Sequence, residues 1–119
     1  MEALFIVLND TDHLEDIMEK FLELGVKGAT VVDSDGMAGY IVRSHPGMNS
    51  LLSGHFAKLG KSYNPNSKTI FTVVKDHAMA DRVAGAIKEI LINTEKKIIG
   101  FMFTVPVSQI YTLSNHWIK

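Results

Sequence analysis

The sequence predicts an α+β fold with the element order βαββαβ, and two observations carry this prediction. Strand-like apolar segments alternate with helical segments, as in Leu4–Leu8, a following helix, and then Ala29–Val32. The pattern returns in the second half, where Leu4-Phe-Ile-Val-Leu-Asn-Asp10 aligns with Ile70-Phe-Thr-Val-Val-Lys-Asp76. Two strand–helix–strand units in series give the ferredoxin-like sandwich, a four-stranded antiparallel sheet with two helices on one face.

Each helix is predicted from its apolar spacing and its end signals. Asp12 and Glu15 fit a capping box, with Asp12 as the N-cap, and Gly25 supplies the C-terminal stop. Between them one helical face carries Leu14, Ile17, Met18, Phe21 and Leu22. The second helix is expected at about Met79–Leu91, with a buried face of Val83, Ala84, Ile87, Ile90 and Leu91.

The strands predict an association between copies of the chain. The third and fourth strands are expected at Lys68–Val74 and Gly100–Pro106. A sheet with one face in water alternates apolar and polar residues. Leu4–Leu8 contains no polar residue, and Phe101-Met-Phe103 is apolar on both faces. An exposed apolar face of this size marks an interface, so we expect a homo-oligomer packed sheet to sheet.

Composition places the chain among ordinary globular proteins. Its 119 residues are 46% hydrophobic and 21% charged, which predicts a single domain over residues 1–119. A net charge of −1 gives no pull toward nucleic acid, and the lack of cysteine excludes disulfides and thiolate chemistry. The start lacks a signal peptide's basic region, and the apolar run 98–107 is too short for a membrane span. The expectation is a cytoplasmic protein without direct membrane insertion.

A long excursion, residues 34–67, separates the second and third strands. Loops longer than about 12–15 residues in compact domains are usually functional or disordered. It contains Pro46 and Pro65 together with Gly36, Gly39, Gly47, Gly54 and Gly60. Within it, 49–59 has weak helical spacing, which suits a short docking helix. The alternative is a tolerated insertion without function.

The sequence contains few residues or motifs that indicate catalysis or metal binding. Asp33-Ser-Asp35-Gly36 resembles the start of a calcium loop, but Ser44 stands where that loop needs a Glu. His45 and His55 are weak candidates for a transition metal, because neither belongs to a short His-rich ligand spacing. The sequence has no nucleophile elbow, Walker loop or dinucleotide fingerprint. It therefore predicts no enzyme, and Trp117 is read as a packing anchor.

Several segments resemble one known family, the nitrogen-regulatory P-II signalling proteins, and more closely their divergent P-II-like branch. They are "LELGVKGATVVDSDGM" (22–37), "TIFTVV" (69–74) and "GFMFTVPVSQIY" (100–111), so the likeness spans nearly the whole chain. The resemblance implies a homotrimer whose sheets face each other around the axis. It also implies that the excursion is the mobile T-loop, and that small effectors, typically adenine nucleotides, bind in clefts between subunits. No cofactor is required, and the loop regulates a partner, an enzyme or a membrane transporter.

Site residues follow from this resemblance position by position. Gly28 and Thr30 match the Gly-x-Thr that sits against the nucleotide, and Gly36 matches the glycine that opens the T-loop, with Met37 beside it. Val73 matches the third-strand position whose backbone lines the adenine pocket. Gly100 is what remains of the phosphate loop, and Phe101 stands where the family has a lysine.

The departures from the family weaken the case for a triphosphate. Thr112 and Ser114 replace the Arg-x-Arg pair after the fourth strand, and Asp33 and Asp35 add negative charge nearby. Burial of a triphosphate needs Lys or Arg donors. The candidate substitutes are Arg43, Lys96 and Lys97. The expected effector is an adenine nucleotide of lower charge or a related anion.

Two alternatives stay open. The trimeric divalent-cation-tolerance family shares the fold, and His45 and His55 motivate a metal-binding protein similar to it. A small enzyme of the acylphosphatase kind is the second alternative. Its chemistry wants an Arg in a phosphate-cradling loop after the first strand, and residues 9–12 supply acid there instead.

Overall fold

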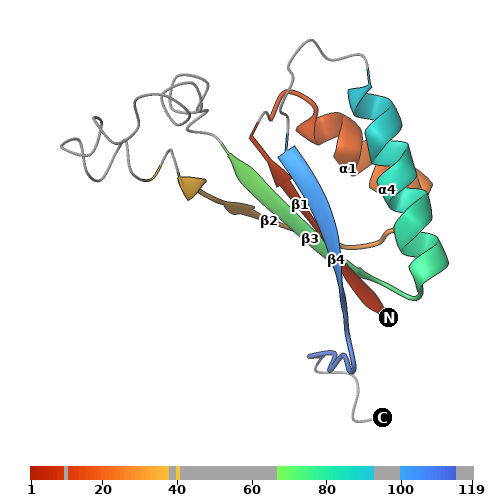
Figure 1. The fold of residues 1–119 in the computed structure, drawn as a ribbon. Coiled ribbons are helices and arrows are strands. Elements are labelled where there is room, and N and C mark those ends of the chain that lie inside the picture. The colour runs from red at the N-terminus through yellow and green to blue at the C-terminus, as the bar shows by residue number, and fades with distance from the viewer. Residues whose placement is uncertain (10, 38–39, 41–66, 93–99, 115–119) are drawn as a thin grey trace.

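The predicted fold and element order are confirmed in a computed structural model, which describes residues 1–9, 11–37, 40, 67–92 and 100–114 (Figure 1). The elements are β1 (Glu2–Leu8), α1 (Leu14–Glu23), β2 (Thr30–Asp33), β3 (Lys68–Val74), α4 (His77–Leu91) and β4 (Gly100–Pro106). The four strands form one antiparallel sheet in the order β2-β3-β1-β4. Both helices lie on the same side of it.

The core lies between the sheet and the helices. Alternate residues of a strand point to opposite faces, so Leu4, Ile6 and Leu8 of β1 all face the helices. These three are 1% exposed, and Ile17, Val83 and Ile87 of the helices are fully buried. Val83 and Ile87 therefore take the buried positions predicted for the second helix, whereas Ala84, Ile90 and Leu91 are only partly buried.

A row of aromatic side chains crosses the opposite face of the sheet. Phe5 pairs with Phe71 on one side and with Phe103 on the other, and Phe71 pairs in turn with Thr30. The ring centroids are 5.7 Å apart for Phe5–Phe71 and 4.9 Å apart for Phe5–Phe103. Phe5 and Phe71 are equivalent positions of the two sequence repeats, so the repeats meet at this pair.

Among the residues that the structure describes, no helix covers this aromatic face, which we call the open face. Its apolar members include Phe5, Val7, Val32, Phe71, Val73, Phe101, Phe103 and Val105. Phe101 and Phe103 are 60% and 44% exposed. Large aromatic side chains left in water on one face of a sheet are typical of an interaction surface.

The start of α1 differs from the sequence prediction. The helix begins at Leu14, its N-cap is His13, and no side chain caps it, so the capping box with Asp12 as N-cap and Glu15 reaching back is wrong. A turn replaces it, because the Leu14 N–H donates to the Thr11 carbonyl at 3.2 Å. His13 has φ −104° and ψ 11°, outside the extended region that a side-chain N-cap favours.

Other element boundaries shift by a few residues. Helix α4 begins at His77 rather than Met79, because the Asp76 carboxylate is its N-cap and accepts from the Met79 N–H at 2.8 Å. Strand β1 begins at Glu2, and β2 begins one residue later than predicted. In the part of the chain that the structure describes, no helix combines the length and apolar content needed to cross a membrane.

Candidate functional site

The connection from α1 to β2 is shaped by a glycine. Gly25 has φ +84°, a left-handed conformation that favours glycine. Its N–H donates to the Leu22 carbonyl at 3.2 Å, and the Val26 N–H donates to the Phe21 carbonyl at 2.8 Å. These two bonds form a Schellman motif, and Val26 joins Phe21 in the core. The motif ends the helix and fixes the path of the following residues.

That path runs beside the end of β3 and leaves a groove of about 420 Å³. One wall is residues 24–28, and the other is residues 72–75 with Met79 of α4. The Thr72 hydroxyl, on a residue only 5% exposed, donates to the Gly28 carbonyl at 2.5 Å and joins the two walls. We call this the lysine groove, because Lys27 and Lys75 both line it.

Two of the sequence-predicted site residues meet in the lysine groove. Gly28 and Val73 come from opposite walls of it, and their contact with an effector stays a prediction. Thr30 does not line the groove. It is the first residue of β2 and pairs with Phe71 at the edge of the open face.

Gly36 and Met37 lie beyond the end of β2 and outside this groove. The Gly36 carbonyl accepts from the Tyr40 N–H at 2.9 Å, and the Met37 side chain is 64% exposed. They follow β2 along the chain and do not contribute to the groove.

Gly100 and Phe101 lie at the opposite edge of the sheet, at the start of β4. A Cβ atom on Gly100 would lie 1.9 Å from the Val7 carbonyl oxygen, so the close approach of β1 requires glycine here. Phe101 lines a second groove of about 520 Å³ between β4 and α4, which is mostly apolar and includes Lys88. The predicted site residues thus form two groups, at opposite edges of one sheet.

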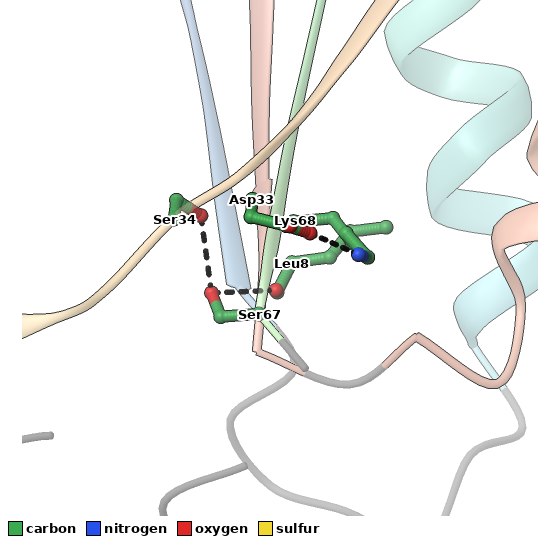
Figure 2. A network of polar contacts seen from close by, with 5 residues as sticks. All are labelled: Leu8, Asp33, Ser34, Ser67 and Lys68. Atoms are coloured by element: carbon green, nitrogen blue, oxygen red, sulfur yellow. Dashed lines mark hydrogen bonds and ion pairs between the residues drawn. The ribbon is translucent and has the colours of Figure 1, made fainter. Parts of the chain in front are cut away.

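A polar network closes the base of the excursion (Figure 2). The Ser34 N–H donates to the Ser67 carbonyl at 3.0 Å, and the two hydroxyl oxygens are 3.3 Å apart. Ser67 is 3% exposed, and its hydroxyl donates to the Leu8 carbonyl at 3.0 Å. Lys68 forms an ion pair with Asp33 beside it. The two ends of the excursion are therefore fastened to each other and to the end of β1.

A second polar cluster lies at the other end of β1. His77 Nδ1 is 2.9 Å from Glu2 Oε1, and His77 Nε2 is 3.4 Å from Asp81 Oδ2. The hydrogen bond to Glu2, and after it the charge of Asp81, raise the pKa of His77 above its usual 6.5. Glu2 pairs with Val74 in the sheet, so this cluster is next to the lysine groove.

Lys27 and Lys75 line this groove, and neither is among the site residues predicted from the sequence. No acidic residue lines the groove between them, and neither lysine forms an ion pair with the residues that the structure describes. One lies before the second strand and the other after the third, so only the antiparallel pairing of β2 with β3 brings them together. No local motif contains both.

The remaining sequence candidates lie elsewhere. His45, His55, Arg43, Lys96, Lys97 and Trp117 fall outside the described residues. Among residues 1–9, 11–37, 40, 67–92 and 100–114, no group of three acidic or histidine side chains could hold a metal ion.

The structure is that of a ferredoxin-like α+β protein with an apolar sheet face and a groove at one edge of the sheet. The family model for nitrogen regulatory protein P-II matches residues 1–116, and the chain therefore belongs to the P-II family. Members of this family are signalling regulators. A search of curated proteins finds no match.

Proposed function

We propose that this protein is a P-II-like signal-transduction protein that binds a small effector between subunits and regulates a partner through residues 34–67. The effector is an adenine nucleotide or a related anion, and the partner is an enzyme or a membrane transporter. The observation that carries the proposal is the separation of the predicted site residues into two groups, at opposite edges of one sheet. In a single copy of the chain, these two groups therefore do not form one site.

The open face supports a homotrimer as the assembly that completes the site. Its aromatic row lies at the centre of the sheet, where contact with other copies removes the largest apolar area from water. In a closed ring of identical subunits, one edge of each copy meets the opposite edge of the next. The Gly28–Val73 edge of one subunit then faces the Gly100–Phe101 edge of its neighbour.

The network at the base of the excursion supports a route from effector to loop. Ser67 connects the loop ends to the Leu8 carbonyl, and Leu8 pairs with Gly100 at the start of β4. An effector that contacts the β4 edge therefore acts one strand away from the loop base. Effector binding of this kind needs no catalytic group and no resident cofactor. We propose that the protein acts in the cytoplasm.

Calorimetric titration with ATP, ADP, AMP and cyclic AMP tests this function. We expect at least one of them to bind with one molecule per chain, and the P-II assignment of the site fails if none gives heat at millimolar concentration. Phe103→Asp places a charge in the open face and should abolish both trimer and binding, while the far-ultraviolet circular dichroism stays unchanged. The matched control is Leu113→Asp, because Leu113 is 95% exposed and lies outside that face.

A further inference from the structure

The lysine groove carries two positive charges that its own lining does not balance. Lys27 and Lys75 are exposed residues on opposite walls of the groove, and the remaining lining residues are uncharged. An anion bound in this groove would be attracted by both ammonium groups and would accept charge-assisted hydrogen bonds from them.

The backbone of the groove is open to a ligand. Cβ atoms placed on Gly25 and Gly28 would meet nothing within 4 Å, so space lies in front of the main chain at both positions. The Gly28 carbonyl already accepts the Thr72 hydroxyl. Because the Gly28 carbonyl oxygen is already hydrogen-bonded, its partial negative charge repels a bound anion less strongly.

Other parts of the predicted site are less suited to an anion. The groove at Phe101 is mostly apolar, with Lys88 at its rim. The β2 edge beyond Val32 carries Asp33 and Asp35, and Lys68 is already paired with Asp33. Among the described residues, the lysine groove has the most favourable charge.

We propose that Lys27 and Lys75 form the subsite that holds the anionic group of the effector, an inference that rests on the proposed function. The class of anion is a compact dianion, namely a phosphate monoester such as the phosphate of a nucleoside monophosphate. A phosphate monoester carries about −1.5 to −2 charges at neutral pH, which two ammonium groups neutralise. A triphosphate brings more negative charge than this groove balances.

Titration with AMP and adenosine tests the proposal, because the two probes differ only in the phosphate. The wild-type protein is expected to bind AMP at least tenfold more tightly than adenosine, with an affinity that falls as salt rises. Lys27→Gln and Lys75→Gln should each weaken AMP about tenfold and leave adenosine within twofold of wild type. Lys75→Arg keeps the charge and should retain most of the AMP affinity.

Arg82→Gln is the matched control, since Arg82 is an exposed cation of α4 that lines neither groove. Thermal unfolding of all variants reports on folding, which these exposed lysines should not affect. Equal AMP affinity in the wild type and in the Lys27 and Lys75 variants overturns the subsite and leaves the proposed function standing. Equal affinity of the wild type for AMP and adenosine would also overturn the subsite and leave the proposed function standing. If no adenine compound binds the wild type, both the subsite and the proposed function fail.

Discussion

Gly100→Ala tests whether this predicted effector residue has a packing role. A methyl group on Gly100 would lie 1.9 Å from the Val7 carbonyl oxygen and 2.9 Å from the Val7 carbonyl carbon. Real Cβ contacts stay beyond 3.0 Å, so β4 must retreat from β1 by about 1 Å at this point. Both neighbours are backbone atoms, and a side-chain rotation cannot relieve the collision.

The cost follows from the sheet hydrogen bonds next to the collision. Gly100 pairs with Leu8 and Phe101 pairs with Val7, so a retreat of this size weakens the ladder at the start of β4. Each backbone hydrogen bond contributes about 1 kcal/mol net, and distortion of the chain adds to it. We expect a loss of about 2–3 kcal/mol, or roughly 10 °C in Tm for a domain of this size.

Chemical and thermal denaturation measure this loss. Gly85→Ala is the matched control: it lies in α4, a Cβ there meets nothing within 4 Å, and alanine should stabilise the helix by about 0.5–1 kcal/mol. If Gly100→Ala unfolds at the wild-type temperature and only effector binding is lost, the packing argument is refuted.

Three further predictions concern the polar clusters and the groove. Ser67→Ala should lower the free energy of unfolding by about 1–2 kcal/mol, because the buried Leu8 carbonyl loses the hydroxyl that donates to it. Ser34→Ala should lower it by less than about 1 kcal/mol. Urea denaturation measures both values, and equal losses in the two variants would contradict this ranking. The raised pKa of His77 adds stability that is complete below its ordinary value of 6.5 and is lost as pH rises through the folded-state value. Unfolding measured from about pH 6 to pH 8 should therefore show a decline that His77→Gln removes, and an unchanged decline in that variant would rule out His77 as its source. Gly28→Ala should leave the free energy of unfolding within about 0.5 kcal/mol of wild type, because a Cβ there projects into open space. It should weaken AMP binding, because a ligand would approach through that space. Unchanged AMP affinity would count against the groove as the binding site.

Sequence reasoning recovered the fold because the repeat and the apolar periodicity are strong local signals. The alignment of Phe5 with Phe71 anticipates the pair that joins the two repeats at the centre of the sheet. The lack of polar residues in Leu4–Leu8 likewise predicts that the sheet face opposite α1 and α4 is apolar. Helix ends were less predictable: a turn at Thr11 takes the place of the expected cap, because capping patterns do not exclude a competing backbone hydrogen bond.

The candidate site was only partly predictable. The family resemblance predicts Gly28 and Val73 as effector contacts, and both line one groove, but their role in binding stays a prediction. Lys27 and Lys75 were missed because their proximity depends on strand pairing and not on any spacing along the chain. Gly100 was assigned to phosphate binding, yet its collision with the Val7 carbonyl gives it a structural reason that only three-dimensional coordinates reveal.

Native mass spectrometry of the protein with an adenine nucleotide tests the central proposal most directly, because one spectrum reports both the number of chains and the number of bound ligands. We predict a complex of three chains that carries up to three nucleotides, with the bound species lost in Phe103→Asp. A monomer that binds nucleotide, or a trimer that binds none at saturating concentration, would contradict an effector site shared between subunits.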